Sequence, residues 1–199
     1  PVQSTRSMRF SKHTFDICFS VFALAIVLPF VPFFYVLFSI SNGFPVIFKQ
    51  PRVGLNGKVF TLYKIRTIDS KYHPKQVPED QLDAWVQKPQ TDDLVPWGRF
   101  LRRWSFDELP QLVNVLKGEM SIVGPRPRLL SEERQSKYRL RLSVKPGLTG
   151  LWQISGRNIV ARTDAEELDE YYIENWSFLM DVQIMVKTFR AIRMGLGAR

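Results

Sequence analysis

The chain has 199 residues, enough for one domain with a hydrophobic core and an appendage. Its 28 lysine and arginine residues outnumber 19 acidic residues, and the formal net charge of +9 favours nucleic acid, an anionic membrane face or a phosphorylated substrate as partner. The single cysteine, Cys18, excludes a disulfide framework within the chain.

Residues 17–48 carry no charge and are long enough to cross a bilayer, which needs about 20 apolar residues. Pro29 and Pro32 divide this segment, and a proline inside a helix removes a hydrogen bond and bends the axis. Basic residues, which favour the cytoplasmic side, flank both ends. We therefore expect residues 1–48 to form a re-entrant membrane hairpin that bends at the two prolines. A kinked transmembrane helix and a core helix of a soluble protein are the alternatives.

Residues 49–199 have the composition of a soluble domain. Residues 58–67 alternate as a strand does, with Lys64 and Arg66 on one face. Beyond this strand we expect a long polar loop over 69–98 with a short helix near 81–87. We expect helices over 109–116, over 131–141, where the helix is charged, and over 164–176, where it is acidic. Between these helices we expect a rigid turn over 124–128, a turn over 146–150 and a short strand over 151–154.

The C-terminal segment shows the clearest periodicity in the chain. Apolar residues recur at steps of 4, 3, 4, 3 and 4 from Phe178 to Leu196, and basic residues lie off this stripe. A basic amphipathic helix of this kind can lie on an anionic membrane. A core-facing helix with a solvated back is the alternative interpretation.

Two adjacent carboxylates, Asp107 and Glu108, stand between two clusters of arginines. Arginine binds phosphate oxygens with both arms of its guanidinium group, and a carboxylate pair can hold a divalent cation and attack phosphorus. The spacing of Ser105 and Glu108 also fits a capping box, which requires no catalysis. The two interpretations are compatible, because a helix N-terminus keeps a carboxylate ionised and can cradle a phosphate.

The sequence contains no histidine and cysteine spacing for zinc, no phosphate-binding P-loop and no dinucleotide-binding glycine pattern. A nucleic-acid binder fits the apolar N-terminus poorly, so we expect no nucleic-acid partner.

Six motifs in order resemble those of the bacterial sugar transferases, the monotopic polyprenyl-phosphate phosphoglycosyl transferases, in their minimal catalytic core. They are residues 64–67, 98–111, 118–128, 146–153, 156–158 and 169–177. The sequence departs from the family at Ile68, where the family often has methionine, and at Leu28, where a small polar residue often precedes the hairpin proline.

The resemblance implies an α+β, mostly helical fold. In it, the membrane hairpin of residues 1–48 joins a small globular catalytic domain, residues 49–199, with amphipathic interfacial helices. It also implies a phosphoglycosyl transferase at the cytoplasmic face of the bacterial inner membrane. This enzyme transfers a phosphosugar from a UDP-sugar to undecaprenyl phosphate and releases UMP, the first membrane step of glycan assembly. The lipid bilayer is then a partner, and a homodimer is left open.

By position, the resemblance makes Asp107 the nucleophile that carries the phosphosugar, and Glu108 a ligand of Mg²⁺ beside it. We assign the substrate phosphates to Lys64, Arg66, Arg102, Arg126 and Arg128, and the nucleotide-sugar region to Gly150, Gln153, Arg157 and Asp169. The competing function is a non-catalytic membrane adaptor that grips anionic lipids, in which the carboxylate pair only caps a helix.

Overall fold

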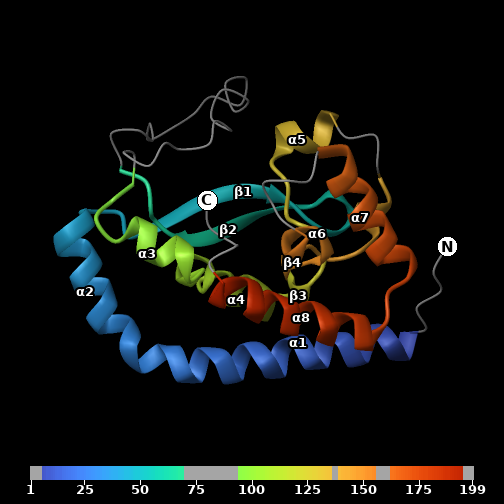
Figure 1. Cartoon of the computed structure of the whole chain (residues 1–199), viewed down its shortest axis with the longest axis horizontal. Helices are drawn as coiled ribbons and strands as arrows, with labels where there is room; N and C mark the ends of the chain where they lie inside the picture. The colour runs from blue at the N-terminus through green and yellow to red at the C-terminus, as the bar shows by residue number, and fades with distance from the viewer. Residues whose placement is uncertain (1–5, 70–93, 136–138, 156–161, 195–199) are drawn as a thin grey trace.

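A long N-terminal helix and two small sheets organise a mostly helical chain (Figure 1). The computed structural model describes residues 6–69, 94–135, 139–155 and 162–194. The expected helix near 81–87 and most of the expected loop over 69–98 lie outside the described residues.

The apolar segment forms two helices in series, α1 (Arg6–Val27) and α2 (Val31–Asn42), joined by the 3-10 helix η1 (Leu28–Phe30). Pro29 lies in η1, and Pro32 lies in the first turn of α2, where its missing N–H costs no hydrogen bond. At this joint α2 turns away from the axis of α1 (Figure 1). The bend therefore falls at the two predicted prolines, and the re-entrant course itself stays a prediction.

Residues Phe10–Asn42 are long and apolar enough to span a membrane, and only 6% of their most apolar window is buried. Large apolar side chains such as Phe22, Phe33 and Ile40 are exposed. This exposure argues against the alternative of a soluble core helix, since such a helix would bury these side chains.

Both ends of this segment contact the rest of the chain. Near its start, the Asp16 carboxylate accepts a hydrogen bond from the Ile122 backbone N–H at 3.0 Å, and Lys12 forms an ion pair with Asp181. Near its end, Phe38 packs with Val46 and Leu101 in a small buried cluster. Between these ends, Phe19, Ala23 and Leu24 also pack against the main core, so α1 lies along the globular body.

The first sheet is an antiparallel hairpin of β1 (Ile47–Val53) and β2 (Val59–Ile65), joined through the 3-10 turn η2 (Leu55–Gly57). The strand expected over 58–67 is confirmed as β2, whereas β1 was not predicted. Because Arg52 pairs with Phe60 and Phe48 pairs with Lys64, the side chains of Arg52 and Lys64 lie on the same face of the hairpin.

The second sheet corrects two predictions. Residues 147–149, expected within a turn, form strand β4 (Gly147–Thr149), which pairs in parallel with β3 (Ser121–Val123). Residues 151–154, expected as a strand, form the short helix α6 (Leu151–Ile154). A four-residue apolar run shows no period, so helix and strand cannot be told apart from sequence. The parallel partner β3 is also 26 residues away along the chain, as the pairing of Ser121 with Gly147 shows.

The remaining elements follow the predictions more closely. The expected helix over 109–116 is α4 (Gln111–Leu116), preceded by α3 (Gly98–Arg103) and the 3-10 helix η6 (Phe106–Glu108). The acidic helix is α7 (Arg162–Glu174). Within the charged helix expected over 131–141, the described residues form α5 (Leu130–Gln135) and the 3-10 helix η7 (Leu140–Ser143). Residues 136–138 lie outside the described residues.

The C-terminal helix α8 (Phe178–Arg193) lies beside α1, where the rings of Phe15 and Phe178 meet edge to face at 5.2 Å (Figure 1). Its Asp181 and Ile184 are buried, and Ile184 joins the main core with Leu62, Leu112 and other apolar residues. Five apolar residues of α8 are nevertheless exposed, namely Phe178, Leu179, Val182, Val186 and Phe189. Of the predicted stripe, Phe178, Val182 and Phe189 are exposed, whereas Met185 packs against the main core and Ile192 is half-buried. The exposed apolar side chains favour the membrane-surface interpretation over a wholly core-facing helix.

We expect Gly147→Ala to lower the free energy of unfolding by at least about 3 kcal/mol, because overpacking against rigid backbone cannot relax. A methyl group at Gly147 would lie 2.1 Å from the backbone nitrogen of Gly124. The control is Gly57→Ala, where the added methyl group meets open space and only the positive φ of 74° opposes it, at a cost of about 1 kcal/mol. Circular dichroism melting in detergent compares the two variants, and equal losses would contradict the close approach of the backbones.

Candidate active site

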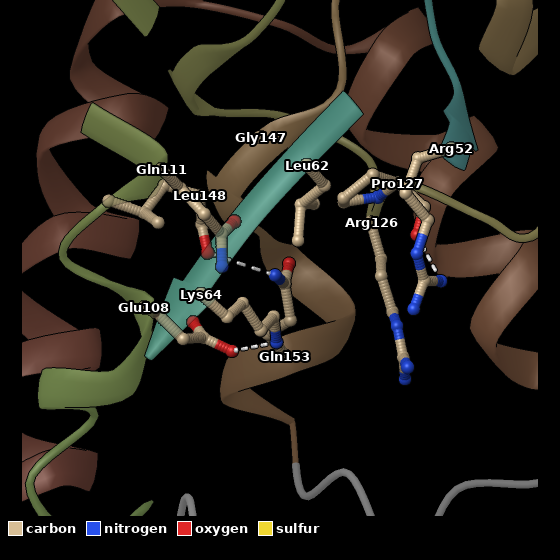
Figure 2. A pocket seen from close by; sticks show the side chains of 10 residues that line it. All are labelled: Arg52, Leu62, Lys64, Glu108, Gln111, Arg126, Pro127, Gly147, Leu148 and Gln153. Carbon is tan, nitrogen blue, oxygen red and sulfur yellow. Dashed lines mark hydrogen bonds and ion pairs between the residues drawn. The ribbon is translucent and has the colours of Figure 1, made fainter. Parts of the chain in front are cut away.

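A cavity of about 110 Å³ opens beside the carboxylate pair, on the face of the β1–β2 hairpin that carries Lys64 (Figure 2). It is lined by Arg52, Leu62, Lys64, Glu108, Gln111, Arg126, Pro127, Gly147, Leu148 and Gln153. Three of these side chains are cationic and one is anionic, so the lining carries a net positive charge that suits an anionic ligand. A larger cavity of about 710 Å³ lies between α1, η7 and the end of α7, and none of the predicted site residues lines it.

The carboxylate pair closes η6, just before α4. Ser105 precedes it with a left-handed backbone (φ 55°), and its side chain makes no capping hydrogen bond. The capping-box interpretation is therefore wrong, because the serine oxygen accepts no hydrogen bond from a backbone N–H of the helix start. What holds η6 in place is its packing against β2 and α3, not a cap.

Asp107 is 9% exposed, and burial raises the pKa of its carboxyl group to about 6. The charge of Glu108 raises this pKa too, while Lys64 and Arg102 lower it. The ammonium of Lys64 lies 3.1 Å from Glu108 Oε1, and Arg102 donates from Nε to Thr67 Oγ1 at 3.0 Å. Near neutral pH Asp107 is thus ionised in a poorly solvated position, with two cations close by.

Two arginine side chains fix the segment that carries Arg126 by donating hydrogen bonds to its backbone carbonyl oxygens. Arg141 Nη2 donates to the carbonyl of Arg126, and Arg52 Nη1 donates to the carbonyl of Pro127 at 3.1 Å. The guanidinium group of Arg126 lies 5.1 Å from the centroid of the Trp152 ring, within cation–π range. These contacts direct Arg126 into the cavity lining.

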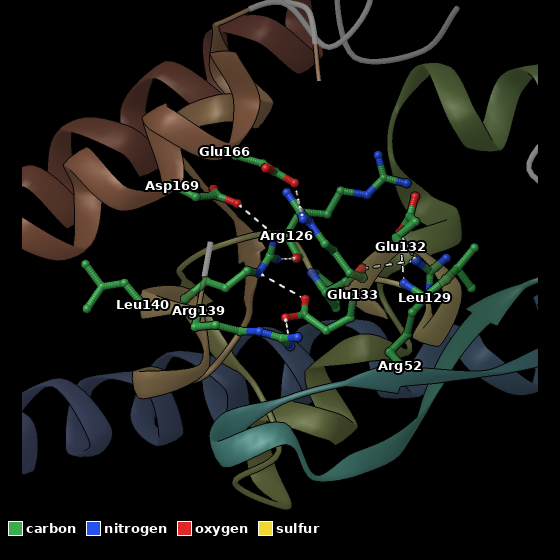
Figure 3. A network of polar contacts seen from close by, with 12 residues as sticks. Arg52, Arg126, Leu129, Glu132, Glu133, Arg139, Leu140, Glu166 and Asp169 are labelled. Atoms are coloured by element: carbon green, nitrogen blue, oxygen red, sulfur yellow. Dashed lines mark hydrogen bonds and ion pairs between the residues drawn. The ribbon is translucent and has the colours of Figure 1, made fainter. Parts of the chain in front are cut away.

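Behind this segment lies a buried network of ion pairs (Figure 3). Arg128 pairs with Glu166, and Arg141 lies 3.5 Å from Asp169 and 3.6 Å from Glu133. Burial raises the pKa of Asp169 to about 6, although the charge of Arg141 lowers it. Burial also lowers the pKa of Arg141. The network consists of charges that neutralise one another beneath the Arg126 segment, which it supports.

The structure thus brings together only part of the predicted site. Lys64, Glu108, Arg126 and Gln153 line the cavity. Asp107 and Arg102 are not among the lining residues, but Asp107 precedes Glu108 in the chain and lies close enough to Lys64 and Arg102 for their charges to lower its pKa. The side chains of Arg128 and Asp169 belong to the ion-pair network, and Arg157 lies outside the described residues.

Two further predicted site residues, Arg66 and Gly150, have contacts that support the backbone and do not line the cavity. Arg66 is buried and donates to the carbonyls of Asn42 and Gly43, so its guanidinium group holds the end of α2. Gly150 precedes α6, and a methyl group there would lie 2.2 Å from the carbonyl oxygen of Gly124. Its small size allows the backbone of the cavity rim to approach closely.

Sequence reasoning missed Arg52 and Gln111 as cavity residues. In the sequence, Arg52 is one of the basic residues that follow the apolar segment, and no motif includes it. The signal that could have found it is the turn between Gly54 and Gly57, since a hairpin over this turn places Arg52 and Lys64 on one face.

The residues near the cavity fit a magnesium ion. Mg²⁺ prefers oxygen ligands and is commonly held by one or two carboxylates together with water and substrate phosphates. Asp107 and Glu108 supply two carboxylates at adjacent positions. Within the described residues there is no cluster of three or more histidine, cysteine, aspartate or glutamate side chains, so an all-protein metal cage is not part of this arrangement.

Comparison with known proteins identifies relatives along nearly the whole chain. The family model described as bacterial sugar transferase matches residues 7–195. The chain is 40% identical over 191 residues to an uncharacterised sugar transferase, EpsL, of Bacillus subtilis, covering 94% of this chain and 89% of that protein. It is 36% identical over 200 residues to the exopolysaccharide production protein ExoY of Sinorhizobium fredii, covering 94% and 88%.

A third relative is longer. The undecaprenyl-phosphate galactose phosphotransferase of Salmonella typhimurium is 40% identical over 205 residues, which cover 97% of this chain and 42% of that protein. The chain therefore spans most of the short relatives and less than half of this long one.

We expect Ser105→Ala to change the free energy of unfolding by less than about 0.5 kcal/mol, because no capping hydrogen bond is lost. The matched control is Ser177→Ala at the start of α8, where the side chain accepts a hydrogen bond from the Met180 N–H at 3.2 Å. Loss of this cap costs about 1 kcal/mol. Thermal melts compare the two variants, and a loss at Ser105 as large as that at Ser177 would restore the capping-box interpretation.

Proposed function

Because the chain belongs to the bacterial sugar transferase family, we propose that it is a phosphoglycosyl transferase that moves a sugar phosphate from a UDP-sugar to a polyprenyl phosphate. The relative from Salmonella typhimurium is an undecaprenyl-phosphate galactose phosphotransferase, which supports undecaprenyl phosphate as acceptor. The single observation that carries the proposal is a cationic, phosphate-sized cavity lined by Glu108, whose neighbour in the chain is the buried carboxylate Asp107.

In the first step, an oxygen of the Asp107 carboxylate attacks the phosphorus that carries the sugar. The bond from this phosphorus to the oxygen that bridges the two phosphates breaks, and UMP leaves with the electron pair. The sugar phosphate is then bound covalently to Asp107 as an acyl phosphate. The poor solvation of Asp107 favours this attack, because the carboxylate has little hydration to lose.

In the second step, a phosphate oxygen of the polyprenyl phosphate attacks the same phosphorus. Asp107 leaves as a carboxylate, and the product is a polyprenyl diphosphate sugar. Two bulky substrates thereby use one small cavity in turn, which suits its volume of about 110 Å³.

Both steps bring an anion towards phosphate oxygens that repel it. Lys64 and Arg126 in the cavity lining, with Arg102 beside Asp107, offset this repulsion. When bound by Asp107 and Glu108, Mg²⁺ would supply further charge neutralisation at the phosphates. Lys64 also holds Glu108 at 3.1 Å and so orients a carboxylate that would serve the metal.

The exposed apolar surface supports a membrane location for the acceptor. Large apolar side chains are exposed along α1 and α2, on α3 and on α8. A polyprenyl phosphate keeps its chain in the bilayer and its phosphate at the headgroup level, where an interfacial enzyme meets it. We place the protein at the bacterial inner membrane with its catalytic domain on the cytoplasmic face, where a re-entrant course of residues 1–48 would leave both ends.

We expect Asp107→Asn to abolish the release of UMP from a UDP-sugar and to leave the thermal melting midpoint within a few degrees, because the amide is isosteric but not nucleophilic. The wild-type chain given the UDP-sugar without acceptor should gain the mass of one phosphosugar, measured by intact mass spectrometry. Glu167→Gln, an exposed position on α7, is the control and should release UMP at the wild-type rate. Near-normal turnover by Asp107→Asn would exclude this nucleophile, and a wild-type chain that releases no UMP would favour the membrane adaptor.

We expect cysteines introduced singly at Ser4 and Asn56, in a Cys18→Ala background, to resist an impermeant thiol reagent in intact cells and to react after lysis. The physical reason is that both ends of the apolar segment carry basic residues and contact one globular body. Labelling is read as a mass shift on a gel. Reaction of the Ser4 site from outside would show that the helix crosses the membrane.

A further inference from the structure

Arg52 is the cavity cation to which neither the sequence motifs nor the proposed mechanism assigns a role. It lies on β1, and the hairpin register places it on the same face as Leu62 and Lys64. Its exposed fraction is 8%, although an arginine at the end of a two-stranded hairpin could readily extend into water. The fold therefore holds this charge inside the site.

The position of Arg52 is electrostatically costly. Figure 2 shows its guanidinium group beside that of Arg126, with both groups in the lining of the cavity. Burial lowers the pKa of Arg52 to about 10, and the charge of Arg126 lowers it too. The nearest paired carboxylate oxygen, on Glu132, is 3.8 Å away, a weak contact for a buried charge.

The hydrogen bonds of Arg52 do not require a positive charge. Its Nη1 donates to the carbonyl of Pro127 and its Nη2 donates to the side chain of Gln50, whereas its Nε is buried without a partner. A neutral amide could make such contacts without the cost of desolvating an ion. A second cation beside Arg126 is explained when an anion shares the cavity with them.

The size and charge of the cavity restrict that anion. Its volume of about 110 Å³ is well below the roughly 300 Å³ at which pockets for drug-sized ligands begin, so a nucleoside does not fit inside it and a phosphoryl group does. We propose that Arg52 binds a phosphoryl group of the donor diphosphate together with Arg126. This inference rests on the proposed function and assigns Arg52 as a substrate-binding residue.

The test measures the binding of UDP and of inorganic pyrophosphate to the full chain in detergent by titration calorimetry. We expect Arg52→Gln to weaken both dissociation constants by about 10- to 100-fold, the range for a lost hydrogen bond to a charged group. Arg52→Lys keeps the charge but loses the two-armed fork that binds phosphate oxygens, so it should bind more weakly than the wild type and more tightly than Arg52→Gln. The matched control is Lys49→Gln, an exposed cation on the same strand, which should bind as the wild type does.

Each outcome decides a separate point. Glutamine can still donate to the carbonyl of Pro127, so wild-type affinity in Arg52→Gln would show that Arg52 only supports the Arg126 segment, and the inference would be overturned. Equal losses in Arg52→Gln and Lys49→Gln would overturn it as a general effect of charge. If Arg52→Gln does not fold, as shown by its melting midpoint, Arg52→Lys decides, and unchanged affinity for UDP together with unchanged KM would overturn the inference. A wild-type chain that binds UDP and releases UMP leaves the proposed function standing in each of these cases, whereas failure of both would remove the proposed function itself.

Discussion

The cavity depends on how the segment from Gly124 to Arg128 is held. Two guanidinium groups, from Arg141 and Arg52, donate to the carbonyl oxygens of Arg126 and Pro127. Buried backbone carbonyls need such donors, and charged donors make the stronger hydrogen bonds. Because these donors come from η7 and β1, the segment is fixed only when distant parts of the chain have packed together. The ion-pair network behind it supplies the anions that make a buried Arg141 tolerable.

The electrostatics of the two sides of this segment differ in a way that suits phosphate chemistry. On the inner side, the buried arginines meet three carboxylates, and their charges balance because Arg139 also pairs with Glu133. On the cavity side, cations outnumber the one carboxylate in the lining. The fold neutralises the arginines of the ion-pair network and leaves a net positive charge in the cavity lining. The cavity is therefore a preformed site for an anion. Asp107 precedes Glu108 of the cavity lining in the chain. Burial raises the pKa of Asp107, and the charges of Lys64 and Arg102 lower it.

The apolar N-terminal segment is long and apolar enough to bring this site to a membrane, as the proposed function requires. Its start is tied to the body through Lys12 and Asp16, and its end through Phe38 and the two carbonyls that Arg66 holds. Exposed apolar side chains on α8 add a second surface of the same kind. A rigid connection of this sort lets the catalytic domain keep a constant height relative to the headgroups, where the acceptor phosphate of the proposed reaction lies.

Several features of this protein could be predicted from sequence because they are local or belong to long motifs. The bend at Pro29 and Pro32 follows from the chemistry of proline, α7 and α8 follow from their length and period, and the family follows from motifs that span the chain. The carboxylate pair and the arginines around it were visible for the same reason. The capping box was the misleading local pattern, because tertiary packing gives Ser105 a left-handed backbone that removes the cap.

What only the tertiary structure decided depends on contacts between distant residues. Strand β4 exists because Gly147 pairs with Ser121 and Thr149 pairs with Val123, and no local pattern contains that pairing. Arg126 and Arg128 are two residues apart in the sequence, yet one faces the cavity and the other pairs with Glu166. Arg52 joins the site through the hairpin register and the carbonyl of Pro127, 75 residues away. The sequence by itself determined which charges are available, and the packing of η7, β1 and α7 determined which of them are neutralised and which remain for a phosphate.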